Sequence, residues 1–337
     1  MSARPVKLAE GVVREPLRVV VSGGSVSLFV TPPRSRRDEG NYGELLPRLL
    51  AEHGVIAETN HQGQWFDLVS DFRRRYEHAV RNRFPDVLVL NYGMGECQPN
   101  FVPTWAARHF ASWDMSSAPA AVAYRRSVAP RIWKVLRRWQ RFAASRTTRP
   151  SWRLSPGRFA REMQRVIELA REETGCLVLV LDCDPPGSRF THWVPGMWQR
   201  WERYQEVLAK LIDGLGDPEV RLVAASRTIL DEFDHVDDAL PDGIHRTAQA
   251  HVRTAELLTA EIMDWLDRPA ATRDGARQRL AEKRAGEEAA RWKEVLAEVA
   301  PEVAEAAAIP LGEETPAASR FEKLINVKDR GQIFRVD

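Results

Sequence analysis

Apolar and polar positions along this chain alternate in the rhythm of a parallel α/β fold. Short apolar runs typical of buried strands occupy residues 17–21, 55–57, 87–90, 176–181 and 220–225. Between and after them, apolar residues recur at helical spacing over residues 42–53, 65–83, 156–174, 197–214 and 247–267. Strands that alternate with helices predict a three-layer α/β/α sandwich around a mostly parallel, five-stranded sheet.

Residues 101–161, between the third and fourth predicted strands, interrupt this alternation. They are too many for a plain crossover, and they carry thirteen Lys or Arg residues, one acid and five tryptophans. A helix is expected at residues 128–142, and one of its faces holds Ile132, Val135, Leu136 and Trp139. We therefore predict a basic, Trp-rich helical insertion at residues 101–155, beside the edge of the sheet where such folds bind ligands.

The two ends of the chain differ from its middle. Residues 1–15 are rich in charge, which predicts a loosely held N-terminal arm. Residues 268–337 are rich in Ala, Glu and Arg with helical periodicity up to residue 308, and a tail with Pro and Gly follows. We expect one domain at residues 16–267 and a helical C-terminal extension at 268–337, packed on that domain or on a second copy of the chain.

Composition narrows the class of protein further. The 337-residue chain has a formal net charge of only +2, so nucleic acid is not an expected partner. Its three cysteines are too few for a disulfide framework or a zinc site, and we expect no metal and no other cofactor. The chain has no apolar leader and no run of about 18 apolar residues, so we predict a soluble, cytoplasmic protein without a membrane span.

Candidate catalytic residues lie at opposite ends of the predicted domain. Asp242 stands three residues before His245, in the loop that opens the 247–267 helix. This spacing lets a carboxylate hold one imidazole nitrogen while the other nitrogen faces a nucleophile. Ser25 follows the first strand on two glycines, and a serine hydroxyl needs such a base to lose its proton. Taken alone, Ser25 is more typical of a helix cap, and His245 is as typical of a surface loop.

Two stretches, Gly23-Gly24-Ser25 and Asp242-Gly243-Ile244-His245, together resemble the SGNH (GDSL-type) hydrolase family over residues 16–267. The resemblance implies a flavodoxin-like α/β/α fold, a Ser25 nucleophile, a His245 base and an Asp242 that orients the base. It also implies that no cofactor is needed. One departure lies in the first motif, because Gly24 stands where the family has Asp.

The resemblance further implies an oxyanion hole, to which the second motif contributes a Gly and the third an Asn. Gly63 follows the second strand and takes the place of that Gly, although a plain loop glycine is the other interpretation. The third motif departs from the family, because Gly95 stands in the position of the Asn. Asn91, or a backbone N–H of Gly93 or Gly95, would then have to complete the hole.

Three other residues have competing interpretations. Cys97 could be an alternative nucleophile, but a buried, inert thiol is favoured because no His is positioned in the sequence to activate it. Asp182 and Asp184 end the fourth strand, where two carboxylates could bind a metal but more often cap a turn. We predict no metal site there.

The basic insertion also has two interpretations. It could be a lid over an anionic substrate with flat or sugar-like faces, because Arg pairs with carboxylate or phosphate and Trp stacks. It could instead be a solvated helical face whose tryptophans belong to the core. We favour the core for the tryptophans and an anionic partner for the charge. The candidates are a phosphate-bearing substrate, an acidic carrier protein, and the Glu-rich segment after residue 280 of a second copy, which would make a homo-oligomer through the C-terminal helices.

Two functions of different classes follow. The first is a serine esterase, deacylase or acyltransferase acting on an acyl ester or amide of a carbohydrate or a small, anionic metabolite. The second is a catalytically silent SGNH-type protein that binds a ligand or a protein partner. Replacements at positions 24 and 95 favour the second, whereas the spacing of Asp242 and His245 opposes it. A hydrogen-bond distance between Ser25 Oγ and a His245 ring nitrogen would favour catalysis.

Overall fold

The computed structural model describes residues 16–28, 30–31, 40–99, 101–102, 106, 109, 119–146, 151–268, 285–286 and 289–294. The chain divides into two compact units, residues 1–280 and 281–337. In the second unit, the described residues 285–286 and 289–294 are helical. The predicted N-terminal arm and the rest of the C-terminal extension lie outside the described residues.

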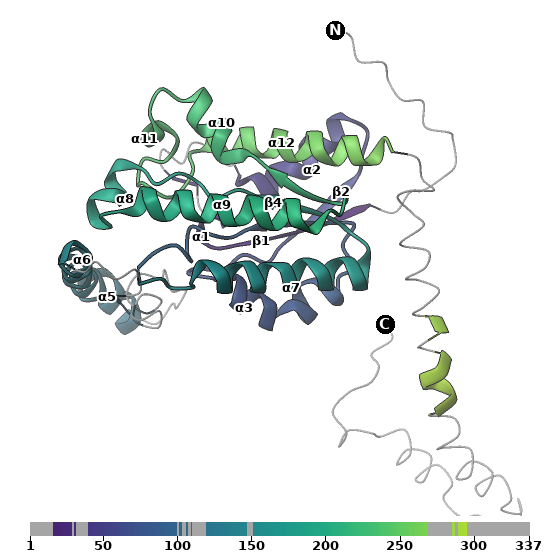
Figure 1. Ribbon diagram of the computed structural model, residues 1–337, viewed down its shortest axis with the longest axis horizontal. Helices are drawn as coiled ribbons and strands as arrows, with labels where there is room; N and C mark the ends of the chain where they lie inside the picture. Colours follow the sequence, from purple (N-terminus) through teal and green to yellow (C-terminus); the bar gives the residue numbers. More distant parts are fainter. Residues whose placement is uncertain are drawn as a thin grey trace, which may run out of the picture. The chain divides into compact units, whose positions relative to one another are not determined.

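A five-stranded parallel sheet forms the middle of the first unit (Figure 1). Its strands are β1 (Leu17–Gly23), β2 (Ala57–His61), β3 (Val87–Asn91), β4 (Leu177–Leu181) and β5 (Val220–Val223). They pair in the order β2-β1-β3-β4-β5, and every neighbouring pair is parallel. This is the flavodoxin-like order, so the predicted three-layer fold class is confirmed.

Helices cover both faces of the sheet (Figure 1). One face packs against α2 (Tyr42–Glu52) and α12 (Ala248–Leu266), and the other against α3 (Val69–Arg74), α7 (Pro156–Thr174) and α9 (Met197–Leu215). Alternate residues of β3 enter opposite cores, Leu88 and Leu90 on the α7 side and Val87 and Val89 on the α12 side. Because both of its faces are covered, β3 is a continuous apolar run in the sequence.

Local signals explain the helix boundaries that the sequence predicts well. Pro156 begins α7, where its missing N–H costs nothing, and Gly175 ends the helix with a left-handed φ of 62°. Thr247 caps α12 by accepting a hydrogen bond from the N–H of Ala250. The short helices α1 (Ser25–Leu28), α8 (Ser188–Trp193), α10 (Ala225–Glu232) and α11 (Val236–Ala239) were not predicted.

The five strands differ from their predicted bounds by one or more residues, and the second and fifth differ for a clear physical reason. The second strand covers Ala57–His61 rather than residues 55–57, and Ile56 is 70% exposed. As an edge strand, β2 pairs with β1 alone, so its polar residues stay partly exposed and the apolar pattern does not mark it. The fifth strand ends at Val223 rather than at residue 225, because Ala225 already begins α10.

The predicted helix at residues 65–83 is wrong as a single element. The chain first turns through Phe66, whose φ of 54° is left-handed and incompatible with a continuing helix. The α-helix α3 then covers Val69–Arg74, and a π-helical turn, η1, covers Glu77–Arg81. The apolar positions of residues 65–83 do face the core, but the backbone between them is interrupted.

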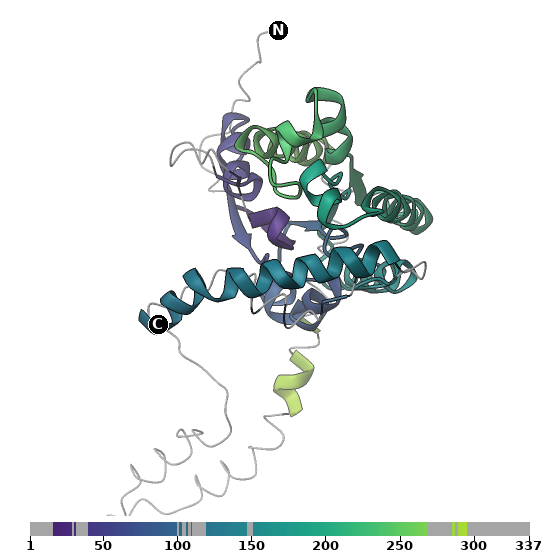
Figure 2. The ribbon, with the colours of Figure 1, turned by 90° about the vertical axis from the view of Figure 1, so that its left-hand side faces the viewer.

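The insertion contains two helices, α5 (Pro119–Ser127) and α6 (Ala129–Arg146), of which only the second was predicted. Figure 2 shows them as a long helical segment along one side of the sheet domain. The four apolar residues predicted to share a face do lie on one helix, but the prediction that the tryptophans of the insertion belong to the core is wrong for Trp139. Ile132 and Leu136 are half-buried, whereas Val135 and Trp139 are 62% and 51% exposed. Among the described residues, no helix is both long enough and apolar enough to cross a membrane.

Candidate active site

Ser25 lies at the carboxyl end of β1, as the first residue of α1. Its Oγ is 3.0 Å from Nε2 of His245, although 220 residues separate the two in sequence. Residue 23 must be a glycine for β1 to lie this close to β3, because a Cβ there would lie 2.6 Å from the carbonyl oxygen of Asn91. The close approach of β1 and β3 therefore brings Ser25 to the edge where parallel sheets bind ligands.

His245 is held by the loop that precedes α12. Its Nδ1 is 2.6 Å from Oδ2 of Asp242. The other oxygen, Oδ1, accepts hydrogen bonds from the N–H groups of Ile244 (2.9 Å) and His245 (2.8 Å). Gly243 has a φ of 90°, and a Cβ there would lie 2.5 Å from the nitrogen of Phe190. The Asp-Gly-x-His motif is thus a tight turn packed against α8, with the Asp bonded to both backbone and side chain of the His.

Ser25, His245 and Asp242 form a hydrogen-bonded line, and the contacts of Asp242 determine where its protons lie. Burial raises the pKa of Asp242, but the His245 ring and the two backbone N–H groups outweigh burial and hold it below its usual range. An ionised Asp242 accepts a hydrogen bond from the Nδ1–H group of His245, so Nε2 is left with its lone pair toward the Ser25 hydroxyl. The ring of Trp65 meets the imidazole edge-on, with centroids 6.2 Å apart.

Two arginines bring positive charge near this line. The guanidinium of Arg137, on α6, stacks over the ring of Trp193 at 4.6 Å. Burial lowers the pKa of Arg137, the nearby charge of Arg189 lowers it further, and Asp242 acts in the opposite direction. Because Trp193 belongs to α8, this stacking ties α6 to α8.

Arg246, directly after His245, is fully buried and anchors the loop from behind. Its Nε and Nη2 donate to Oδ1 of Asp184 at 3.0 and 2.5 Å, and its Nη1 donates to Thr254. The Thr31 hydroxyl donates to the carbonyl oxygens of both His245 and Arg246. Burial outweighs the charge of Arg246 and raises the pKa of Asp184. Arg246 has no predicted role, because an Arg beside a loop His forms no distinguishing pattern in the sequence.

The two aspartates at the end of β4 have separate partners. Asp184 is paired with Arg246, whereas Asp182 accepts a hydrogen bond from the N–H of Ser226 at 2.7 Å and also contacts its hydroxyl. Burial raises the pKa of Asp182 to about 6. Within the described ranges, no three His, Cys, Asp or Glu side chains are grouped to bind a metal ion.

Gly63 lies beside the turn that carries Ser25. A Cβ on Gly63 would lie 2.6 Å from Ser27 Oγ, and the Gly63 N–H points to Nδ1 of His61 at 3.3 Å. Nε2 of the same ring is 3.1 Å from the carbonyl oxygen of Ser27, so His61 links the two loops. Burial lowers the pKa of His61, against the opposing effect of the Ser27 carbonyl. His61 had no assigned role in the sequence, where it looks like any polar residue at a strand end.

The polar groups of the turn after β3 are hydrogen-bonded to other protein groups. The Asn91 amide donates to the Tyr42 hydroxyl at 3.2 Å, and the Gly93 N–H donates to Glu96 at 2.8 Å. Glu96 is fully buried and also accepts the N–H of Val69 at 2.7 Å, which ties the turn to α3. Burial raises the pKa of Glu96 to about 7, although the two N–H groups oppose this. Two of the residues considered for the oxyanion hole, Asn91 and Gly93, are therefore bonded to other groups.

Gly95 and Gly24, the two positions that depart from the family, border the same backbone group. A Cβ on Gly95 would lie 3.6 Å from the Asp67 carbonyl oxygen, and a Cβ on Gly24 would lie 3.4 Å from it. Both distances are ordinary van der Waals contacts, so a Cβ fits at both positions. Cys97, two residues further, is buried, and burial raises the pKa of its thiol, which fits the prediction of an inert cysteine.

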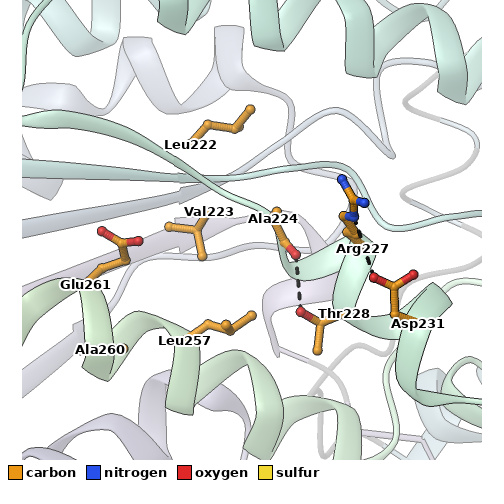
Figure 3. A pocket seen from close by; sticks show the side chains of 9 residues that line it. All are labelled: Leu222, Val223, Ala224, Arg227, Thr228, Asp231, Leu257, Ala260 and Glu261. Atoms are coloured by element: carbon orange, nitrogen blue, oxygen red, sulfur yellow. Dashed lines mark hydrogen bonds and ion pairs between the residues drawn. The ribbon is translucent and has the colours of Figure 1, made fainter.

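A separate hollow of about 360 Å³ lies at the β5 edge of the sheet (Figure 3). Its lining comes from β5, α10 and α12, and includes Arg227, Asp231 and Glu261. Arg227 pairs with Asp231 at 3.5 Å, and Glu261 pairs with Arg221 at 2.7 Å. None of its nine lining residues belongs to the Ser25, His245 and Asp242 line.

Comparisons with known proteins found similarity only among solved structures. No protein-family description and no curated protein sequence matches the chain. A lipase/acylhydrolase from Enterococcus faecalis aligns over 73% of this chain and 94% of its own, with 14% identity and a TM-score of 0.47. The acetylxylan esterase Axe2 from Geobacillus stearothermophilus aligns over 73% and 93%, with 12% identity and a TM-score of 0.46. A putative lipolytic protein of the G-D-S-L family from Desulfitobacterium hafniense aligns over 72% and 98%, with 9% identity and a TM-score of 0.45.

Proposed function

We propose that this protein is a serine hydrolase that cleaves an acyl ester or amide, or transfers the acyl group, with Ser25 as its nucleophile. The single observation that carries the proposal is the unbroken line of hydrogen bonds from Ser25 Oγ through His245 to Asp242, at 3.0 and 2.6 Å. Both distances lie within the range that proton transfer requires. A silent binding protein would have no need for an oriented base at hydrogen-bond distance from a serine, so the geometry favours catalysis.

In the proposed reaction, Ser25 Oγ attacks the acyl carbon while His245 Nε2 takes its proton. Asp242 stabilises the resulting imidazolium. The same proton then passes from Nε2 to the leaving alcohol or amine, which leaves an acyl group on Ser25. A water molecule or an acceptor hydroxyl attacks this acyl group and gives its proton to Nε2. The bond between the acyl carbon and Ser25 Oγ then breaks, Nε2 returns the proton to Oγ, and the carboxylic acid or the new ester leaves.

The oxyanion of each tetrahedral intermediate needs hydrogen-bond donors. The first is the N–H of Ser25, which begins α1 and is among the N–H groups that a helix leaves without an internal partner. The second is the N–H of Gly63, whose long 3.3 Å bond to His61 must give way to the oxyanion. An Asn side chain at position 95 is missing, and one missing donor typically costs roughly 100- to 1000-fold in rate. We therefore expect a slow enzyme on simple esters.

The proposed substrate is an acyl ester or amide of a carbohydrate or another small, anionic molecule. The positive charge of α6 supports an anionic substrate, because residues 119–146 have eight Lys or Arg and no acid. Stacking of Arg137 on Trp193 fixes one guanidinium at the border of the site. Transfer to an acceptor other than water would require the insertion to exclude water during the second half of the reaction.

The test is covalent labelling of the full chain with a fluorophosphonate probe that reacts with activated serines. Labelling should occur in the wild type and be lost in Ser25→Ala and in His245→Ala. Ser188→Ala is the matched control, because Ser188 is an exposed serine bonded to Asp237, and this variant should label like the wild type. A folded wild type that stays unlabelled with excess probe, or a Ser25→Ala variant that still labels, would contradict the proposal.

A further inference from the structure

An exposed apolar stripe runs along the outward face of α6. It consists of Val128, directly before α6, and of Val135, Trp139 and Phe142 in α6, which are 43%, 62%, 51% and 53% exposed. Their spacings of seven, four and three residues put them on one line of a helix. The described residues contain eight large hydrophobic side chains with such exposure, and four of them lie on this stripe. The stripe is therefore a concentrated apolar surface rather than scattered exposure.

A basic stripe runs beside it. Arg131, Lys134, Arg138 and Arg141 are exposed and follow one another at spacings of three, four and three residues. Over residues 119–146 the sequence has eight Lys or Arg and no acid. In the part of the chain that the structure describes, no carboxylate pairs with these four side chains, and Arg141 instead contacts His192 Nε2 at 2.9 Å. The face is thus apolar and positively charged, with its charge not neutralised by described neighbours.

We propose that this face of α6 binds the surface of a bilayer that contains anionic phospholipids. Apolar side chains that include Trp and Phe enter the boundary between headgroups and acyl chains, while Lys and Arg contact lipid phosphates. A nucleic acid would satisfy the cations but leave Val128, Val135 and Phe142 in water. An acidic protein offers negative charge without the apolar medium that four exposed hydrophobic side chains need, so a membrane surface fits both stripes.

The inner side of the same helix lies against the candidate site. Trp133 packs edge-on against Phe66 at 6.5 Å, and Trp65, next in sequence to Phe66, contacts the ring of His245. Figure 1 shows α5 and α6 beside α8, at the end of the sheet where α1 begins. Lipid binding through α6 would therefore bring the Ser25 end of the domain to the membrane surface. The inference does not depend on the proposed reaction, because it uses only the outward face of α6.

The test is cosedimentation of the full chain with lipid vesicles. One set contains phosphatidylcholine alone, and the other contains about one third phosphatidylglycerol, at about 0.05 M and 0.5 M salt. We expect binding to the anionic vesicles and weakening at the higher salt. Trp139→Ser and Phe142→Ser should each weaken partitioning about tenfold, since each side chain loses its apolar burial. Lys134→Ala and Arg138→Ala should each weaken it about fivefold.

Matched controls remove similar groups from other surfaces. Ile56→Ser and Leu230→Ser remove hydrophobic residues that are 70% and 40% exposed, and Arg203→Ala and Arg227→Ala remove exposed charges. These four variants should bind vesicles like the wild type. Absence of binding to anionic vesicles by the folded wild type at low salt would overturn the proposal, as would equal losses in the controls. Binding that soluble polyglutamate abolishes but that Trp139→Ser and Phe142→Ser leave unchanged would also overturn it, and would indicate an acidic protein partner.

Discussion

His245 and Arg246 are neighbours in the chain, and each is bonded to a carboxylate. The His245 pair with Asp242 spans three residues, and the side chain of Asp242 is 35% exposed. The Arg246 pair with Asp184 spans 62 residues, and both side chains are fully buried. The pKa of Asp242 is held below its usual range, whereas burial raises that of Asp184. The His245–Asp242 pair is partly exposed to solvent and contacts Ser25, whereas the Arg246–Asp184 pair is buried in the fold.

The two pairs therefore have different expected roles, the His245–Asp242 pair in the proposed reaction and the Arg246–Asp184 pair in the stability of the loop. A base must exchange protons with substrate, so its carboxylate partner can be local and partly exposed. The loop that carries the base must also keep its distance from Ser25, and a buried ion pair to β4 fixes that loop. We therefore expect the two pairs to respond in opposite ways to mutation: the Asp242 pair should govern rate, and the Asp184 pair should govern stability.

The largest expected effect is on the rate of the Asp242→Asn variant. An amide at position 242 can donate to Nδ1, which favours the wrong imidazole tautomer, so turnover of p-nitrophenyl acetate should fall by about 10⁴-fold. Asp231→Asn is the control, because Asp231 is an exposed carboxylate that pairs with Arg227. A variant within tenfold of the wild type would show that Asp242 only caps its turn.

The next effect is on the stability of the Arg246→Met variant. Removing the Arg leaves the Asp184 carboxylate buried without its partner, which should lower the free energy of unfolding by about 3–5 kcal/mol in urea titrations. The double variant Asp184→Leu with Arg246→Met removes both charges and should be more stable than Arg246→Met alone. Catalysis by the folded double variant, measured well below its unfolding temperature, should stay within about tenfold of the wild type. A double variant less stable than both single variants would argue against this account.

The smallest expected effect is on the pH dependence of stability. Because the folded pKa of Asp242 lies below its unfolded value, its stabilisation is present above about pH 4 and is lost as pH falls through the folded pKa. The pair is partly exposed, so the stabilisation is at most about 1 kcal/mol. The difference in unfolding free energy between wild type and Asp242→Asn should therefore shrink between about pH 5 and pH 3. A difference that stays constant over this interval would contradict the assignment.

Much of the sheet domain is predictable because its local signals agree with its tertiary packing. Pro156 and Gly175 bound α7 at the predicted residues, and the apolar run of β3 marks a strand covered on both faces. The short helices α8, α10 and α11 have too few turns to show a periodicity. Edge strand β2 is polar, and the left-handed Phe66 interrupts an otherwise helical pattern, so neither boundary follows from hydrophobicity.

The candidate site also has a part that follows from local sequence and a part that depends on long-range contacts. The motif around Asp242 and His245 is local, so its spacing already predicts their contact, and the sequence places Ser25 after a strand. The structure adds the support that sequence spacing cannot show: Arg246 with a partner 62 residues away, and His61 linking two loops through its two ring nitrogens. Buried polar pairs of this kind depend on which strands become neighbours, and that information is not local.

The bond between Ser25 and His245 joins the first strand to the loop before the last helix of the sheet domain. During synthesis Ser25 therefore leaves the ribosome some 220 residues before His245, the base of the proposed reaction. A nascent or prematurely ended chain would carry the serine without the group that activates it. In the proposed reaction, Ser25 would therefore become reactive only after residues up to His245 have been made and the loop before α12 has reached β1.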